Sequence, residues 1–331
     1  MQPEEATRRT FPLKMISKSL LQGRNKLTKK PQSRFKVEGI ITALVTPFDD
    51  SGAIKEDALR KLIRFQLRKG IHGFFPCGTT GQGPLMTIDE RKSVAEVVVH
   101  EAKHKVPVIV QVGAPDTNTA ITLAKHAESI GAEAIGCVAP YYYQPDEDSL
   151  VRHYKKISEA VNLPVFVYNI PRHTGINIKP TTLLRLAKMN AIVGVKDSTR
   201  DFLQLVETIQ ILPKDFMVIN GSEGYLLPAL LMGAKGAVSA LANALPEFFT
   251  ELFSMFKKGD LEGAKTSQFR MNNVKRIAER GGLSSIYEIL RERGIDCGGP
   301  RGPLRAMTND ERLQMLTSLK VLGAPFAPAS V

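Results

Sequence analysis

The sequence predicts an α/β protein, a (β/α)8 barrel (the TIM-barrel arrangement) with a C-terminal helical extension. Eight short apolar runs recur between residues 39 and 239, longer amphipathic stretches separate them, and three further helical patterns follow. A chain of 331 residues, 43% of them hydrophobic, has enough apolar side chains for one large core. We therefore expect a basic extension at residues 1–36, a barrel at residues 37–258 and a helical cap at residues 259–331.

The eight apolar runs are short and nearly continuous, which is typical of parallel strands buried on both faces. In chain order they are Gly39–Val45, Gly73–Cys77, Val108–Val112, Ala134–Val138, Val165–Tyr168, Ile192–Val195, Phe216–Ile219 and Gly236–Ser239. An open doubly wound sheet is the competing architecture. That fold usually has a glycine-rich dinucleotide turn after its first strand, whereas here the first run continues into Thr-Pro-Phe at residues 46–48.

Amphipathic segments between the runs predict the barrel helices. Thr87 stands three residues before Glu90, as in a capping box, and Gly70, Gly131 and Gly233 stand where helices should end. The expected helices are Glu56–Lys69, Asp89–Lys103, Thr119–Ile130, Asp148–Val161, Thr182–Lys188, Phe202–Ile211, Tyr225–Met232 and Pro246–Lys258. Three more patterns, at Leu261–Arg280, Ser284–Arg293 and Asn309–Leu322, are too many for the barrel and predict the cap.

Positive charge is concentrated at the start of the chain. Residues 1–36 contain ten Lys or Arg and two Glu, so +8 of the net charge of +12 lies there and +4 is left for the rest. We interpret this segment as a disordered extension, or as the result of a start assigned too early, with Met15 as an alternative start. A nucleic-acid-binding arm is the competing interpretation, and we do not expect a nucleic-acid partner.

Composition also indicates the compartment. No run approaches the roughly 18 apolar residues that a membrane span needs, and no signal peptide is recognisable. The three cysteines are odd in number and far apart in the sequence. Cysteines of this kind are typical of ordinary core thiols in a reducing compartment, so we expect a cytoplasmic protein with no membrane partner.

Polar residues at the ends of the apolar runs are the candidate catalytic groups, because active sites of such barrels lie at the C-terminal ends of the strands. Lys196 ends the sixth run; apolar surroundings would lower its pKa and make its amine a nucleophile toward a carbonyl. Tyr168 ends the fifth run and would move protons for such a lysine. A solvated loop lysine and a core tyrosine are the structural alternatives.

Further candidates follow other runs. Gly78-Thr79-Thr80-Gly81 offers hydroxyl and backbone N–H groups for a carboxylate, and Tyr141, Tyr142 and Tyr143 suggest an interface or a lid over the site. Ser222 and Ser239 are candidates for binding substrate hydroxyls, although helix capping explains Ser222 equally well. The six histidines form no cluster with metal-ligand spacing, so we expect no metal and no cofactor.

Five motifs together resemble the dihydrodipicolinate synthase/N-acetylneuraminate lyase family of class I pyruvate-dependent aldolases. They occur in the family's order and spacing, and the resemblance extends over roughly residues 37–325. The motifs are Thr-Pro-Phe at 46–48, Gly-Thr-Thr-Gly at 78–81, Pro-Tyr-Tyr at 140–142, Tyr-Asn-Ile-Pro at 168–171 and Gly-Val-Lys-Asp at 194–197.

The resemblance implies a role for each matching residue. Lys196 corresponds to the Schiff-base lysine and Tyr168 to the proton shuttle, with Thr80 and Tyr142 as its relay partners. Thr79 and Thr80, beside Gly81, correspond to the grip on the pyruvate carboxylate. Tyr141 becomes the interface candidate of an expected homotetramer, a dimer of dimers, because a tyrosine of this pair packs across a neighbouring subunit in several family members.

One departure bears on the aldehyde partner. Dihydrodipicolinate synthases typically carry Arg two residues after the proline of Tyr-Asn-x-Pro, where this chain has His173, and Arg172 stands one residue earlier. Other details resemble archaeal 2-keto-3-deoxygluconate aldolase, and hydroxyls at Ser198 and Ser222 suit a polyhydroxylated substrate. We expect a 2-keto-3-deoxy sugar acid aldolase. The alternative is 4-hydroxy-tetrahydrodipicolinate synthase, which condenses pyruvate with aspartate semialdehyde in lysine biosynthesis.

Overall fold

A computed structural model describes residues 35–326. The basic segment expected at residues 1–36 lies outside the described residues except for Phe35 and Lys36. The described residues belong to one compact unit, which includes both the barrel strands and the C-terminal helices.

Eight parallel strands form the predicted barrel. In spatial order they run β2-β1-β8-β7-β6-β5-β4-β3, and a parallel bridge between Phe74 and Val108 links the two ends of this sheet into a nearly closed ring. The strands are β1 Gly39–Thr42, β2 Gly73–Phe74, β3 Ile109–Gln111, β4 Ala134–Val138, β5 Val165–Asn169, β6 Ile192–Asp197, β7 Met217–Asn220 and β8 Gly236–Ser239.

Side chains alternate between the two faces of this sheet, as strand geometry requires. Phe166 and Tyr168 of β5 point into the barrel and pack with Ile219 and Val238, whereas Val167 packs against the outer helices. The interior of the barrel is therefore a filled apolar core. A polar side chain that points inward near the C-terminal end of a strand lies above that core, beneath the barrel mouth.

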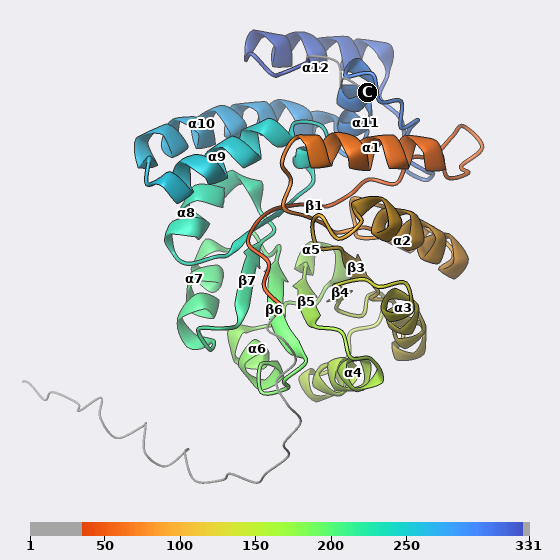
Figure 1. The fold of residues 1–331 in the computed structure, drawn as a ribbon, viewed down its shortest axis with the longest axis vertical. Coiled ribbons are helices and arrows are strands. Elements are labelled where there is room, and N and C mark those ends of the chain that lie inside the picture. The colour runs from red at the N-terminus through yellow and green to blue at the C-terminus, as the bar shows by residue number, and fades with distance from the viewer. Residues whose placement is uncertain (1–34, 327–331) are drawn as a thin grey trace, which may run out of the picture. The chain divides into compact units, whose positions relative to one another are not determined.

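Figure 1 shows the helices of the barrel; all but the short helix Pro171–Thr174, which is labelled near the centre of the view, follow one another around the strands in chain order. They are α1 Glu56–Arg68, α2 Ile88–Ala102, α3 Thr117–Ser129, α4 Glu147–Ala160, α5 Pro171–Thr174, α6 Pro180–Leu186, α7 Phe202–Ile211, α8 Leu226–Leu231 and α9 Pro246–Lys258. None of the helices within residues 35–326 is both long and apolar enough to cross a membrane.

Most element boundaries lie near those expected, and the differences have local causes. The capping box at Thr87 and Glu90 is present. Helix α3 begins at Thr117 because the Asp116 side chain accepts from the N–H of Thr119 in its first turn, and α6 begins at Pro180 because proline suits the first helical turn. Strand β6 continues two residues beyond its apolar run, since Lys196 and Asp197 still pair with Tyr168 and Asn169.

Three helices form the C-terminal cap: α10 Leu261–Ala278, α11 Ser284–Glu292 and α12 Asn309–Val321. In Figure 1 they gather on one side of the barrel, next to α1 and α9. Arg293, at the end of α11, is fully buried, and its guanidinium donates to the Ala244 carbonyl and the Glu247 carboxylate at the start of α9. Cys77, Cys137 and Cys297 are buried free thiols.

Candidate active site

Lys196 lies inside the barrel near the C-terminal end of β6, where only 5% of its surface is exposed. Its Nζ is 3.8 Å from the centroid of the Tyr168 ring and 4.2 Å from that of the Phe75 ring. Burial lowers the pKa of the Lys196 amine, and the neighbouring Tyr168 acts in the opposite sense. A buried lysine between two rings therefore has a larger neutral, nucleophilic fraction than a solvated one.

Tyr168 lies directly beside Lys196, because the two residues pair across β5 and β6. The ring is 3% exposed and packs edge-on against Phe75, with 5.6 Å between the centroids. Its hydroxyl is 3.2 Å from the Thr79 Oγ1 atom. Phe75, which our sequence analysis left unassigned, thus forms a wall of the site; its inward position follows from alternation within the second apolar run.

The Gly-Thr-Thr-Gly loop brings Thr79 to the tyrosine. Thr80 is half-buried and, within the described residues, no hydrogen bond joins it to Tyr168. Gly81 is buried, and its carbonyl accepts a hydrogen bond from Thr46 Oγ1 at 2.7 Å. The structure therefore pairs Tyr168 with Thr79, where Thr80 was the expected partner, because adjacent loop residues direct their side chains differently.

The tyrosines after β4 are divided between the interior and the surface. Tyr141 is half-buried and packs against the interior cluster that contains Tyr168. Tyr142 is 87% exposed, has a φ of +78° and stacks edge-on against Tyr143, which is 76% exposed. Within this chain Tyr142 is therefore directed to the surface, away from the buried Tyr168. Tyr142 is thus the more exposed of the two, and the interface role expected of Tyr141 stays a prediction.

Three serines lie at the ends of β6, β7 and β8. The Ser198 Oγ atom is 1.9 Å from where a Cβ on residue 221 would stand, so only glycine fits opposite this hydroxyl. Ser222 bonds through its backbone to the side chain of Asn220. The Ser239 hydroxyl donates to a Glu223 carboxylate oxygen at 2.7 Å and accepts from the Ala242 N–H.

Glu223 was absent from the sequence-based candidates. The Glu223 Oε1 atom accepts hydrogen bonds from Ser239 and from the backbone N–H of Leu241. A half-buried carboxylate is thereby fixed between the ends of β7 and β8. Its place directly after Gly221-Ser222 was the available signal, since polar residues after a barrel strand are candidates by position.

Arg172 and His173 lie together on α5. The Arg172 Nε donates to His173 Nε2 at 3.0 Å, so that nitrogen carries no proton. Loss of hydration lowers the pKa of His173, and the positive charges of Arg172 and Arg200 lower it further. His173 is consequently neutral at pH 7, and both side chains are exposed. No group of three or more His, Cys, Asp or Glu suited to a metal ion occurs in residues 35–326.

This arrangement suits a reaction in which a lysine amine attacks the carbonyl group of a substrate. A buried lysine provides the nucleophile, a phenol beside it can transfer protons, and a loop of hydroxyl and N–H groups can hold an anion. An iminium formed on the lysine would withdraw electrons from a breaking C–C bond.

Comparisons with known proteins agree with this geometry. The profile of the Dihydrodipicolinate synthetase family matches residues 36–322. An uncharacterised DapA-like lyase of Halobacterium salinarum is 37% identical over 288 residues, which are 87% of this chain and 94% of that protein. The 4-hydroxy-tetrahydrodipicolinate synthase of Methanopyrus kandleri is 36% identical over 292 residues, 87% of this chain and 97% of that protein.

A solved structure shows the same fold. The chloride-inhibited dihydrodipicolinate synthase of Acinetobacter baumannii, complexed with pyruvate, is 32% identical and has a TM-score of 0.84. The alignment covers 88% of this chain and 100% of that one.

Proposed function

Because the chain belongs to the dihydrodipicolinate synthetase family and is a class I pyruvate-dependent lyase, we propose that it is a 2-keto-3-deoxy sugar acid aldolase with Lys196 as its Schiff-base residue. The observation that carries the residue assignment is the buried amine of Lys196, 3.8 Å from the Tyr168 ring. The substrates in the direction of synthesis are pyruvate and a hydroxylated aldehyde such as glyceraldehyde.

The reaction begins with attack of the neutral Lys196 amine on C2 of the 2-oxo acid. Loss of water gives an iminium. Tyr168 gives its proton to the hydroxyl that departs as water, and the resulting phenolate takes the proton of the C4 hydroxyl while the C3–C4 bond breaks, the aldehyde leaves, and the bonding electrons form an enamine. Protonation at C3 and hydrolysis release pyruvate and restore the amine. The iminium is the electron sink, so this proposal needs no cofactor.

The threonine loop serves two tasks in this proposal. Thr79 relays protons to and from Tyr168, because their oxygens are 3.2 Å apart. Thr80 and the backbone of the loop through Gly81 hold the pyruvate carboxylate. Tyr142, which is exposed in its own chain, would join the relay of a neighbouring subunit.

The choice of aldehyde rests on the charges at the barrel mouth. A bidentate arginine would hold the carboxylate of aspartate semialdehyde, but His173 is neutral and Arg172 is already hydrogen-bonded to it. Ser198 and Ser222 instead offer hydroxyls, whereas the buried Ser239 hydroxyl holds Glu223, whose carboxylate would repel an acidic aldehyde. These groups favour a neutral, hydroxylated partner.

The second candidate is 4-hydroxy-tetrahydrodipicolinate synthase. The Methanopyrus kandleri relative carries that name at 36% identity. Arg172 is exposed, and a rotation of its side chain would supply the guanidinium that position 173 lacks. The two candidates share the pyruvate half-reaction and differ in the aldehyde.

A panel of aldehydes assayed with pyruvate tests the choice. We predict a kcat/KM for glyceraldehyde at least about tenfold above that for aspartate semialdehyde, because a missing charge-assisted bond costs roughly 1.5–3 kcal/mol. Ser198→Ala should narrow the gap. A preference for the semialdehyde that Arg172→Ala abolishes, with sugar aldehydes spared, would establish the second candidate.

A cytoplasmic homotetramer, a dimer of dimers, is part of the proposal. Tyr142 and Tyr143 form one exposed aromatic surface. Neighbouring helices α7 and α8 expose Leu203, Leu231 and Met232, of which Leu203 is 80% exposed. Two separate apolar surfaces are what a dimer of dimers requires, one for each interface.

A further inference from the structure

We propose that Tyr287 and Arg301 of the C-terminal cap are positioning residues for the carboxylate-binding loop, and that they act through Gln82. The inference rests on the proposed function, which gives Thr79 and Thr80 their task. It assigns the cap a part in pyruvate binding, although neither cap residue touches the reacting atoms.

Gln82 is the residue through which the cap reaches the loop. It follows Gly81, is 2% exposed and has a φ of +56°, a conformation that costs free energy for a residue with a side chain. Its backbone N–H donates to the Thr79 carbonyl at 3.1 Å, which closes the turn that carries both threonines. The conformation of Gln82 and the place of Thr79 are therefore set together.

Both ends of the Gln82 side-chain amide are held by the cap. The Nε2 atom donates to the Tyr287 hydroxyl at 2.7 Å, and the Oε1 atom accepts from the Arg301 backbone N–H at 2.8 Å. Tyr287 is 1% exposed on α11, and Arg301 lies in the segment between α11 and α12. A buried amide with both donor and acceptor satisfied has one orientation, which transmits the position of the cap to the turn.

Tyr287 has a second route to the same turn through the Thr-Pro-Phe motif. Its hydroxyl donates to the Thr46 carbonyl at 2.8 Å. Thr46 Oγ1 in turn donates to the Gly81 carbonyl at 2.7 Å. One hydroxyl of the cap therefore supports the turn from both sides, at Gln82 directly and at Gly81 through Thr46.

The segment that carries Arg301 is itself fixed. Phe48 pairs with Cys297 and Gly299 through the backbone, and no side chain fits at Gly298, whose Cβ would be 1.7 Å from the Phe48 carbonyl. The Arg301 guanidinium lies 4.2 Å from the Phe48 ring centroid and bonds the Glu90 carboxylate at the start of α2. These contacts leave the Arg301 N–H little freedom.

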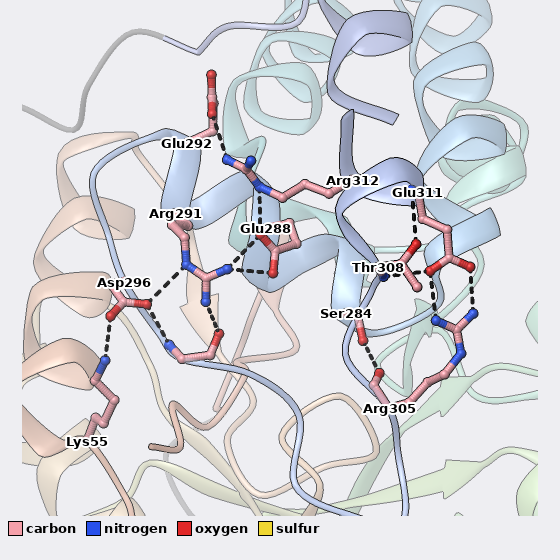
Figure 2. A network of polar contacts seen from close by, with 11 residues as sticks. Lys55, Ser284, Glu288, Arg291, Glu292, Asp296, Arg305, Thr308, Glu311 and Arg312 are labelled. Carbon is pink, nitrogen blue, oxygen red and sulfur yellow. Dashed lines mark hydrogen bonds and ion pairs between the residues drawn. The ribbon is translucent and has the colours of Figure 1, made fainter. Parts of the chain in front are cut away.

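Ion pairs hold the two flanks of this segment, as Figure 2 shows. On one side Arg291 bonds Asp296 and the Gly298 carbonyl, and Lys55 bonds Asp296. On the other side Arg305 pairs with Glu311, while its carbonyl accepts from Ser284. The polar network of the cap therefore helps to fix the position of Arg301, whose backbone N–H orients the Gln82 side chain.

The expected consequence of losing these contacts is weaker binding of pyruvate. Removal of the Tyr287 hydroxyl leaves the Gln82 amide and the Thr46 carbonyl each without one partner, so the threonine turn samples other positions. A less ordered turn weakens the grip on the carboxylate. Tyr168 on β5 and Lys196 on β6 stay in place, because pairing between the two strands holds them.

Tyr287→Phe tests the proposal, with Tyr154→Phe as the matched control. Tyr154 is also fully buried on an outer helix, and its hydroxyl donates to a backbone carbonyl, that of Cys137. Borohydride trapping of the Schiff base at increasing pyruvate concentrations separates binding from the later steps. We expect the half-saturating pyruvate concentration to rise about tenfold in Tyr287→Phe and by less than about twofold in Tyr154→Phe, with the trapping rate at saturation unchanged in Tyr154→Phe.

A second variant keeps the proposal testable if thermal stability also falls. Gln82→Met has nearly the same size and lacks both polar atoms, and it should raise the half-saturating concentration by a similar factor. In the double variant the two effects should not multiply, because both remove one connection. Unchanged pyruvate dependence in Tyr287→Phe, or fully multiplicative effects, would overturn the proposal. A wild type that traps no pyruvate would instead overturn the proposed function.

Discussion

At the scale of single residues, the state of the Lys196 amine decides the chemistry. Burial lowers its pKa from the ordinary lysine value of 10.5. The protonated amine is inert, so the rate of pyruvate trapping should rise with pH through the lowered pKa and reach its plateau below pH 10.5. A profile still rising at that pH would show that the amine is not perturbed. Lys196→Arg, which remains charged, provides the baseline.

Tyr168 supplies the second residue-scale prediction. Tyr168→Phe removes one hydroxyl and keeps the ring that packs against Phe75. Turnover should fall by roughly 10² to 10⁴, the usual scale of general acid–base catalysis, while the melting temperature changes little. Steady-state assays and thermal unfolding measure both quantities. Turnover within about threefold of the wild type would assign Tyr168 a packing role instead.

Sequence reasoning located the two residues of the candidate site whose position alone marks them, and their catalytic roles stay predictions. Lys196 and Tyr168 stand at the ends of apolar runs, and barrel geometry brings strand ends together. The same reasoning did not separate Thr79 from Thr80, because the two are identical in type and adjacent, and the direction of each hydroxyl depends on a turn closed by Gln82. Phe75 was overlooked because an apolar ring within an apolar run is not marked as part of a site, whereas Glu223 was overlooked although its position after the seventh run was a signal.

At the scale of elements, the apolar runs predicted the eight strands because parallel barrel strands are buried on both faces. Some boundaries differ from those expected because an interaction extends the element. Strand pairing extends β6 to Asp197, and side-chain capping by Asp116 starts α3 earlier. The three cap helices were predicted from their sequence patterns, but the contacts that they make with the barrel loops were not. Gln82 and Tyr287 are 205 positions apart, and no local pattern reports a hydrogen bond over that separation.

The pair of Arg301 and Glu90 joins the cap segment to α2 and gives a pH-dependent prediction. The Arg301 guanidinium lowers the pKa of Glu90 from 4.5 to about 2. A lowered carboxyl pKa stabilises the fold above the unfolded value of 4.5, and this contribution is lost as the pH falls through about 2.

The difference in unfolding free energy between wild type and Glu90→Gln should therefore be roughly 1–2 kcal/mol at pH 7 and shrink between pH 4.5 and 2. Urea unfolding across this range measures it. Glu262→Gln, at an exposed pair with Lys265 on α10, is the control and should change stability by a few tenths of a kcal/mol or less. A Glu90 difference that does not vary with pH would mean that the ion pair contributes nothing.

At the scale of the whole molecule, the proposed function assigns the exposed Tyr142 to the site of a second subunit, and this assignment can be tested. We predict that Lys196→Ala and Tyr142→Ala, each nearly inactive alone, regain activity when mixed and allowed to exchange subunits. The Lys196→Ala chain then donates its tyrosine to a site that has an intact lysine. Lys196→Ala mixed with Tyr168→Phe is the control and should stay inactive, because both residues belong to the same chain. No recovery in the first mixture would place Tyr142 in its own subunit's site, or outside any site.

The central claim is that Lys196 forms a Schiff base with pyruvate, and trapping with borohydride tests it most directly. Incubation of the wild type with pyruvate and borohydride should add one reduced pyruvyl group per chain, located by peptide mass spectrometry on the peptide that contains Lys196. Lys196→Ala should take up none. Labelling that persists in Lys196→Ala, or a wild type that remains unlabelled at saturating pyruvate, would contradict the account.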